Sequence, residues 1–237
     1  MKNCVTILLS LLLVFNQSSK AQDSILKKSS PWITPVVLTG LGLAMYNEAS
    51  KNAQLDFRNN HLSNFQTRTD DFLQYTPSLM YLGANVAEKI TGKTDNTLKE
   101  NLGIFVIGTG TYVVISQILK RGINEARPDG GDYSFPSGHT CTAFFGARLL
   151  DKKFRKSKPW LVVSAYTLAS ATGTLRMANN KHWASDVLVG AGLGIASAEF
   201  ASWLYPKLKS SFNKHQAFHI EPILTPNLYA ARLEFRF

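Results

Sequence analysis

The chain has 237 residues, of which 45% are hydrophobic and 18% charged, and its formal net charge is +10. This composition excludes a disordered or fibrous protein, and the length suits one sizeable domain or a bundle of several helices. A basic chain can bind nucleic acid, anionic lipid or a phosphorylated substrate. The sequence has no basic patch interleaved with aromatic residues, so nucleic acid is not expected as a partner.

The first 21 residues have the features of a secretory signal peptide. Lys2 precedes the apolar segment Val5–Phe15, and small residues suited to cleavage follow. An uncleaved membrane anchor is the alternative. Cleavage would remove Cys4 and leave Cys141 as the single cysteine, so we expect a fold that does not depend on an internal disulfide.

Apolar stretches containing Gly and Ala follow along the chain, and they predict helices packed closely through small residues. No long alternation of apolar and polar residues occurs before the C-terminal tail. We therefore predict an all-α fold, a bundle of about six helices over residues 22–210. The stretches are Ile33–Tyr46, Pro77–Ala87, Leu102–Leu119, Thr140–Leu150, Trp160–Leu175 and Val187–Tyr205.

The tail, residues 211–237, differs in pattern from the rest of the chain. Leu233, Phe235 and Phe237 alternate with charged residues. This alternation is typical of a strand. We expect either a short terminal strand or a frayed end.

Two of the apolar stretches, 102–119 and 187–205, approach the roughly 20 residues that span a bilayer. Basic residues gather in the segments 88–101 and 151–159 and after Tyr205. If the later helices span, these segments lie on one side, which the positive-inside rule makes cytoplasmic. We therefore expect a membrane-embedded bundle in the bacterial inner membrane, whose opposite end faces the periplasm.

This orientation conflicts with a cleaved signal peptide followed by a spanning Ile33–Tyr46. Either that segment does not cross the membrane, or the signal is not cleaved, or the protein is soluble and exported to the periplasm.

The first polar cluster follows the stretch 102–119. Lys120 and Arg127 are seven residues apart, and Pro128 prevents a helix from continuing. Basic residues at a helix end can cap carbonyl groups or mark a membrane boundary. They can also bind an anion, and this cluster alone does not decide between these roles.

The second cluster is Pro136, Ser137, Gly138 and His139, directly before an apolar run. Pro and Ser suit the start of a helix, where free N–H groups form a ready anion site. Glycine lets the backbone approach a ligand closely. A histidine there can donate a proton to a departing oxygen.

The third cluster contains Arg176, His182 and Asp186. His182 and Asp186 are four residues apart, on one face of a helix. A carboxylate bonded to one imidazole nitrogen leaves the other free as a base or nucleophile. An ordinary surface pair is the alternative reading.

All three clusters lie at the same end of consecutive helices. The predicted helices 102–119 and 160–175 run toward that end, and 140–150 and 187–205 run away from it. Three cations with helix-start amides suit a phosphate group. We therefore expect these residues to meet: Lys120, Arg127, Ser137, Gly138, His139, Arg176, His182 and Asp186.

The motifs resemble those of the type 2 phosphatidic acid phosphatase family. The matching patterns are Lys120-x6-Arg127-Pro128, Pro136-Ser137-Gly138-His139 and Arg176-x5-His182-x3-Asp186. One position differs from the family pattern: Leu175 stands where the family usually has Ser or Thr. The resemblance covers about residues 75–205.

The resemblance implies a site in which His182, oriented by Asp186, attacks phosphorus and forms a phosphohistidine. His139 would protonate the leaving oxygen, and water would hydrolyse the intermediate. No metal and no cofactor is required. The residues implied in phosphate binding are Lys120, Arg127, Ser137, Gly138 and Arg176.

The expected substrate is a phosphorylated membrane lipid. Candidates are phosphatidic acid, phosphatidylglycerophosphate, undecaprenyl diphosphate and lipid A; the stretch 70–89 is similar to Bacteroidetes members of the family, among which lipid A phosphatases occur. A soluble periplasmic non-specific acid phosphatase is the main alternative. More remote alternatives are a vanadate-dependent haloperoxidase and a non-catalytic membrane protein.

Asp70 and Asp71 are expected to cap the helix that follows them, with lining of the substrate entry as the alternative.

Overall fold

The computed structural model describes residues 30–92, 97–215, 218–225 and 228–235. The predicted signal peptide, residues 1–21, lies outside the described residues.

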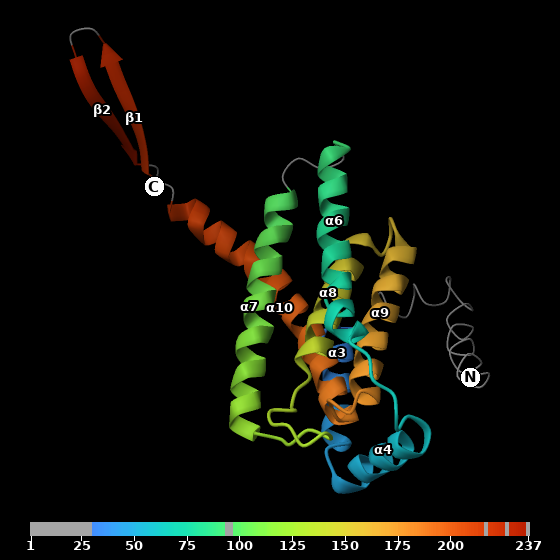
Figure 1. Cartoon of the computed structure of the whole chain (residues 1–237). Coiled ribbons are helices and arrows are strands. Elements are labelled where there is room, and N and C mark those ends of the chain that lie inside the picture. The colour runs from blue at the N-terminus through green and yellow to red at the C-terminus, as the bar shows by residue number, and fades with distance from the viewer. Residues whose placement is uncertain (1–29, 93–96, 216–217, 226–227, 236–237) are drawn as a thin grey trace. The chain divides into compact units, whose positions relative to one another are not determined.

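Every predicted helix is present, and the all-α body is confirmed. Figure 1 shows α6 to α10 gathered as a bundle, in which α8 packs against α6, α9 and α10. The predicted helices correspond to α3 (Ile33–Ala44), α6 (Thr76–Ile90), α7 (Thr97–Ile123), α8 (Gly138–Phe154), α9 (Pro159–Ala178) and α10 (Ala184–His215).

Helix α8 provides the core of the bundle. It begins where predicted, because the side chain of Ser137 accepts a hydrogen bond from the backbone N–H of Thr140 and caps the first turn. Phe145 is fully buried, and its ring centroid lies 5.6 Å from that of Phe105 and 5.1 Å from that of Tyr112 on α7. Such aromatic packing fixes α8 between its neighbours.

Small residues allow α8 and α10 to approach closely, as predicted. A Cβ atom added at Gly190 would lie 2.5 Å from the carbonyl oxygen of Ser137, and one at Gly194 would lie 2.3 Å from that of Cys141. These are backbone atoms that cannot rotate away. Glycine is therefore required at both positions for the two helices to pack as they do.

Replacing Gly190 with alanine is expected to destabilise the protein by about 1–3 kcal/mol, because α8 or α10 must shift to relieve the contact with Ser137. Gly83→Ala is the matched control, since an added Cβ there meets nothing within 4 Å. Because Gly83 lies in the middle of a helix, Gly83→Ala should leave the free energy of unfolding unchanged or raise it by about 0.5–1 kcal/mol. Thermal unfolding in detergent measures both, and equal changes in Tm would contradict the packing argument.

Two further helices, α4 (Glu48–His61) and α5 (Thr69–Leu73), were not predicted. Helix α4 starts at Asn47, whose side chain accepts a hydrogen bond from the N–H of Ser50, and it has no buried residue. Its sequence has no apolar stripe, and polar contacts of Gln54 and Lys51 connect it to the rest of the bundle.

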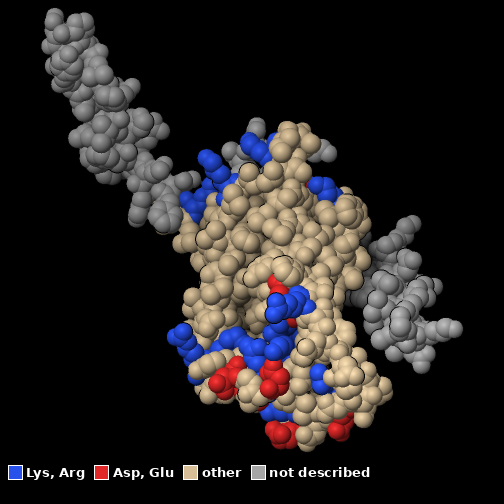
Figure 2. All heavy atoms as spheres, in the orientation of Figure 1, with Lys and Arg blue, Asp and Glu red and all other residues tan. Residues whose placement is uncertain are grey.

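Two helices among the described residues are long and apolar enough to cross a membrane. They comprise Leu98–Ile123, with mean hydropathy 1.8, and Ala184–Ser211, with mean hydropathy 1.5. Only 17% of an apolar 18-residue window in the first is buried, which is unlike the core helix of a water-soluble protein. Figure 2 shows a broad belt without charged side chains on this face, between charged groups at either end.

Helix α3 is too short to cross a bilayer by itself. Its 12 residues rise about 18 Å, against a hydrocarbon core of about 30 Å. Of the alternatives above, the described residues fit the one in which this segment does not span.

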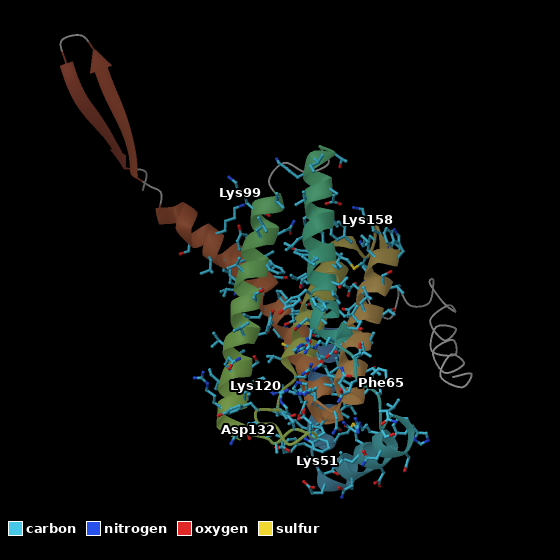
Figure 3. All side chains as sticks on the ribbon, in the orientation of Figure 1. Lys51, Phe65, Lys99, Lys120, Asp132 and Lys158 are labelled. Atoms are coloured by element: carbon cyan, nitrogen blue, oxygen red, sulfur yellow. The ribbon has the colours of Figure 1, made fainter. Side chains whose placement is uncertain are left out.

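The three basic segments share one end of the bundle. Figure 3 shows Lys99 and Lys158 at the end opposite Lys120 and Asp132. The Nζ atom of Lys209, near the end of α10, lies 2.5 Å from a carboxylate oxygen of Glu100 at the start of α7. The sequence-based placement of these segments on a common side is therefore confirmed.

The tail forms an antiparallel hairpin of β1 (Phe218–Thr225) and β2 (Leu228–Phe235), with Phe218 opposite Phe235. A strand at Leu233 and Phe235 was predicted from the alternation, whereas its partner β1 was not. Phe237 lies outside the described residues.

Candidate active site

His182 and Asp186 form a buried pair at the start of α10. The Nδ1 atom of His182 lies 3.5 Å from Oδ2 of Asp186, and both side chains are almost completely buried. Because Nδ1 faces the carboxylate, Nε2 is the ring nitrogen that remains for chemistry.

Ser134 completes this pair, and the sequence did not reveal it. Its hydroxyl donates to Oδ2 of Asp186 and lies 3.4 Å from Nδ1 of His182. The backbone N–H of Trp183 donates to the same carboxylate oxygen at 2.9 Å. Fully buried Ser134 comes from the loop before α8, so this loop and α10 hold the carboxylate together.

Gln54 on α4 holds the loop that carries His182. Its Nε2 donates to the carbonyl oxygen of His182 at 2.9 Å, and its Oε1 accepts from the N–H of Ala184 at 2.8 Å. The indole N–H of Trp183 donates to the carbonyl oxygen of Ala126 at 2.8 Å. The backbone on either side of His182 is thus fixed, which positions its ring.

Lys120 and Arg127 shape the loop between α7 and α8. The Nζ atom of Lys120 donates to the carbonyl oxygen of Tyr133 at 2.6 Å, and Nε of Arg127 donates to that of Asp132 at 2.9 Å. Burial lowers the pKa of Arg127, and the positive charge of Arg176 adds to this effect. The cations therefore lie close enough to repel one another, an arrangement that an anion would stabilise.

Ser137 and Gly138 link the start of α8 to α10. The N–H of Ser137 donates to the carbonyl oxygen of Asp186 at 3.0 Å. A Cβ atom added at Gly138 would meet no protein atom within 4 Å, so packing does not require glycine there. A glycine in such a position suits the close approach of a ligand to the backbone.

Arg176 is buried at the end of α9, with a relative exposure of 6%. Its Nη1 donates to Asp70 at 2.7 Å, while its buried Nε has no hydrogen-bond partner among the described residues. A buried donor without a partner is costly and points to a missing acceptor, which a phosphate oxygen would provide.

Leu175 lacks the hydroxyl group that the family usually has at this position, and the neighbouring Thr174 does not replace it. The hydroxyl of Thr174 donates to the carbonyl oxygen of Ser170 in its own helix, at 3.0 Å.

His139 lies in the first turn of α8. Its Nε2 is 3.1 Å from a carboxylate oxygen of Asp71 on α5. Burial lowers the pKa of His139, the charge of Arg176 lowers it further, and Asp71 opposes both effects.

The prediction that Asp70 and Asp71 cap a helix was wrong. The helix that follows them, α6, starts after Tyr75 without a side-chain cap, and both carboxylates point to the site instead. Together with His139 they also offer three possible metal-ligand atoms within 4.8 Å of one another.

The electrostatics of the pair favour a neutral His182. Burial lowers the pKa of His182 to about 4, with Arg176 and Lys120 acting in the same direction and Asp186 opposing them. Its imidazole is therefore unprotonated at neutral pH, as a nucleophile must be.

Known proteins share this chain's sequence and fold. It is 33% identical over 191 residues to a lipid A 1-phosphatase of Porphyromonas gingivalis, covering 78% of this chain and 40% of that protein. It is 34% identical over 125 residues to the bacitracin transport permease protein BcrC of Bacillus licheniformis, covering 53% of this chain and 54% of that protein. The chain thus spans about half or less of the length of these curated relatives.

A solved structure has the same fold. The crystal structure of a transmembrane PAP2-type phosphatidylglycerolphosphate phosphatase from Bacillus subtilis superposes with a TM-score of 0.54 at 22% identity, covering 74% of this chain and 97% of that one. The PAP2 superfamily pattern matches residues 101–210, the part of the chain that carries the three motifs. Through these residues, the chain is similar to the PAP2 superfamily.

Proposed function

We propose that the protein is a membrane phosphatase that hydrolyses phosphate or diphosphate esters of lipids. The observation that carries this proposal is the buried His182–Asp186 pair beside Arg176, whose Nε has no hydrogen-bond partner in the part of the chain that the structure describes. A nucleophile and an unsatisfied phosphate donor thus share one site, at the end of helices whose apolar sides are exposed.

In the first step, Nε2 of His182 attacks phosphorus while the bond to the leaving oxygen breaks. Asp186 stabilises the charge that develops on the imidazole, and His139 transfers its proton to the leaving oxygen. The product is a phosphohistidine and a free alcohol, or a shorter phosphate when the substrate is a diphosphate.

In the second step, water attacks phosphorus and the bond to His182 breaks. His139, now neutral, accepts a proton from that water, which releases phosphate and restores both histidines. During both steps the charge on the equatorial oxygens is balanced by cations and helix-start amides. The groups proposed for this role belong to Lys120, Arg127, Ser137, Gly138 and Arg176.

The proposed location is the bacterial inner membrane, with residues 22–210 as the phosphatase domain and residues 1–21 as a signal peptide. The basic segments at the end that carries Lys99 and Lys158 support a cytoplasmic position for that end. The site, at the end of Lys120, would then face the periplasm.

Lipid A is the first substrate to test, because the relative from Porphyromonas gingivalis is named a lipid A 1-phosphatase. Phosphatidic acid, phosphatidylglycerophosphate and undecaprenyl diphosphate complete the panel.

The test is release of inorganic phosphate from this panel by the purified protein in detergent. We expect release from at least one lipid, and retention of the protein in the membrane fraction until detergent is added. Release by osmotic shock, together with equal turnover of water-soluble phosphomonoesters, would favour the soluble acid phosphatase instead.

A further inference from the structure

We propose that Asp70 and Asp71 of α5 are positioning residues of the phosphatase site, Asp70 for Arg176 and Asp71 for His139. This inference rests on the proposed function. None of the three sequence motifs contains either aspartate, and both come from a helix more than 60 residues before the groups that they contact.

Asp70 is buried, with 1% exposure, and both of its oxygens are engaged. Oδ2 accepts from Nη1 of Arg176 at 2.7 Å, and Oδ1 accepts from the side-chain amide of Asn179 at 2.8 Å. Asn179 is held in turn by the backbone of Thr67, through bonds of 2.9 Å to its N–H and its carbonyl oxygen.

This chain of contacts fixes one edge of the guanidinium group. Nη1 of Arg176 is occupied by Asp70, while the buried Nε is left for an anion. A guanidinium held in this way loses little side-chain freedom when it binds phosphate. Asp70 therefore acts through Arg176, as partners behind metal ligands do.

Asp71 lies half-exposed beside His139. One of its oxygens is 3.1 Å from Nε2 of His139 and 3.6 Å from Nη1 of Arg176. The charged groups that face His139 are Asp71 and Asp70 from α5 and Arg176 from α9. Burial and Arg176 favour the neutral imidazole, and Asp71, in direct contact with Nε2, is the close negative group that opposes them.

A bound divalent cation is the competing explanation for this cluster. Both oxygens of Asp70 already serve Arg176 and Asn179, which favours the positioning role. The experiments below separate the two.

Asp71→Asn is the first test, measured as the pH dependence of kcat/KM for phosphate release. Removing the negative charge should lower the pKa of His139, so the alkaline limb should move to lower pH by about one unit. The acidic limb, set by His182, should stay in place. Exposed Asp56 provides the control variant Asp56→Asn, which removes the same charge from α4 and should leave the profile unchanged.

Asp70→Asn is the second test, with the inhibition constant of inorganic phosphate as the readout. Loss of the ion pair should weaken phosphate inhibition and lower kcat/KM by about tenfold or more. Asp70→Glu should recover part of both, and thermal unfolding shows whether each variant is folded. Unchanged phosphate inhibition in folded Asp70→Asn would overturn the role of Asp70.

The role of Asp71 has a readout that does not require activity. NMR titration of the histidines in detergent, with the signal of His139 assigned by His139→Gln, should give a lower pKa for His139 in Asp71→Asn than in the wild type. An unchanged pKa would overturn that role. If the wild type releases no phosphate from any lipid while the pKa still falls, the proposed function fails and the contact stands.

Metal dependence is tested on the wild type with EDTA. We expect the rate to be unchanged. Loss of activity that a divalent cation restores in the wild type but not in Asp71→Asn would overturn the positioning role.

Discussion

His182→Ala is expected to reduce phosphate release by about 10³-fold or more, because the proposed mechanism uses Nε2 of His182 as the atom that attacks phosphorus. Asp186 and Ser134 would remain, but they only orient and stabilise the missing ring. The rate is measured on whichever lipid the panel identifies. Equal rates for the variant and the wild type would rule out the mechanism.

The matched control is His61→Ala, since His61 is exposed on α4 and its ring contacts Phe57 of the same helix by stacking and through a hydrogen bond to the backbone carbonyl. It should retain wild-type activity. A covalent intermediate gives a second readout, because a phosphohistidine formed from radiolabelled substrate should be recovered after alkaline quenching from the wild type and not from His182→Ala. Label retained by His182→Ala would place the nucleophile elsewhere.

His139→Ala is expected to have the next largest effect, and its size should depend on the leaving group. From a lipid phosphate monoester the leaving group departs as an alkoxide that needs a proton, so turnover of such a monoester should fall by about 10²–10⁴-fold. The leaving group of 4-nitrophenyl phosphate is a stable phenolate that needs no proton, so turnover of this substrate should fall far less.

The comparison of the two substrates serves as the internal control for folding. A general reduction of activity, such as that caused by unfolding or by displacement of Arg176, would affect both substrates to a similar extent. Equal losses on both would therefore remove His139 from the role of proton donor.

Much of the fold is predictable because the helices of the bundle carry their own signal. Long apolar runs such as 102–119 end at charged or glycine-rich segments, and their alternating direction indicates which ends meet. The structure places the three motifs at one such end, where His182, Asp186 and Ser137 are in contact through hydrogen bonds or ion pairs. That part of the site required only the order and direction of the helices.

The parts that were missed depend on contacts between distant polar residues. Gln54 and His182 are 128 positions apart, and Asp70 and Arg176 are 106 apart. Both polar groups lie in the segment 47–75, which has no apolar stripe to show which face meets the bundle. Ser134 lies in a loop without any periodicity, and Lys120 sets its position through backbone carbonyl groups.

The close approach of α10 to the start of α8 also determines where the site can open. Two backbone contacts hold the starts of α8 and α10 together. Gly190 packs against the carbonyl oxygen of Ser137, and the N–H of Ser137 donates to the carbonyl oxygen of Asp186. Entry of a lipid headgroup between them would break this backbone packing. The segment that carries α4 is the easier one to displace, because α4 has no buried residue. Motion of that segment would carry Gln54 away from the His182 loop, so substrate access and alignment of the nucleophile would be coupled in one movement.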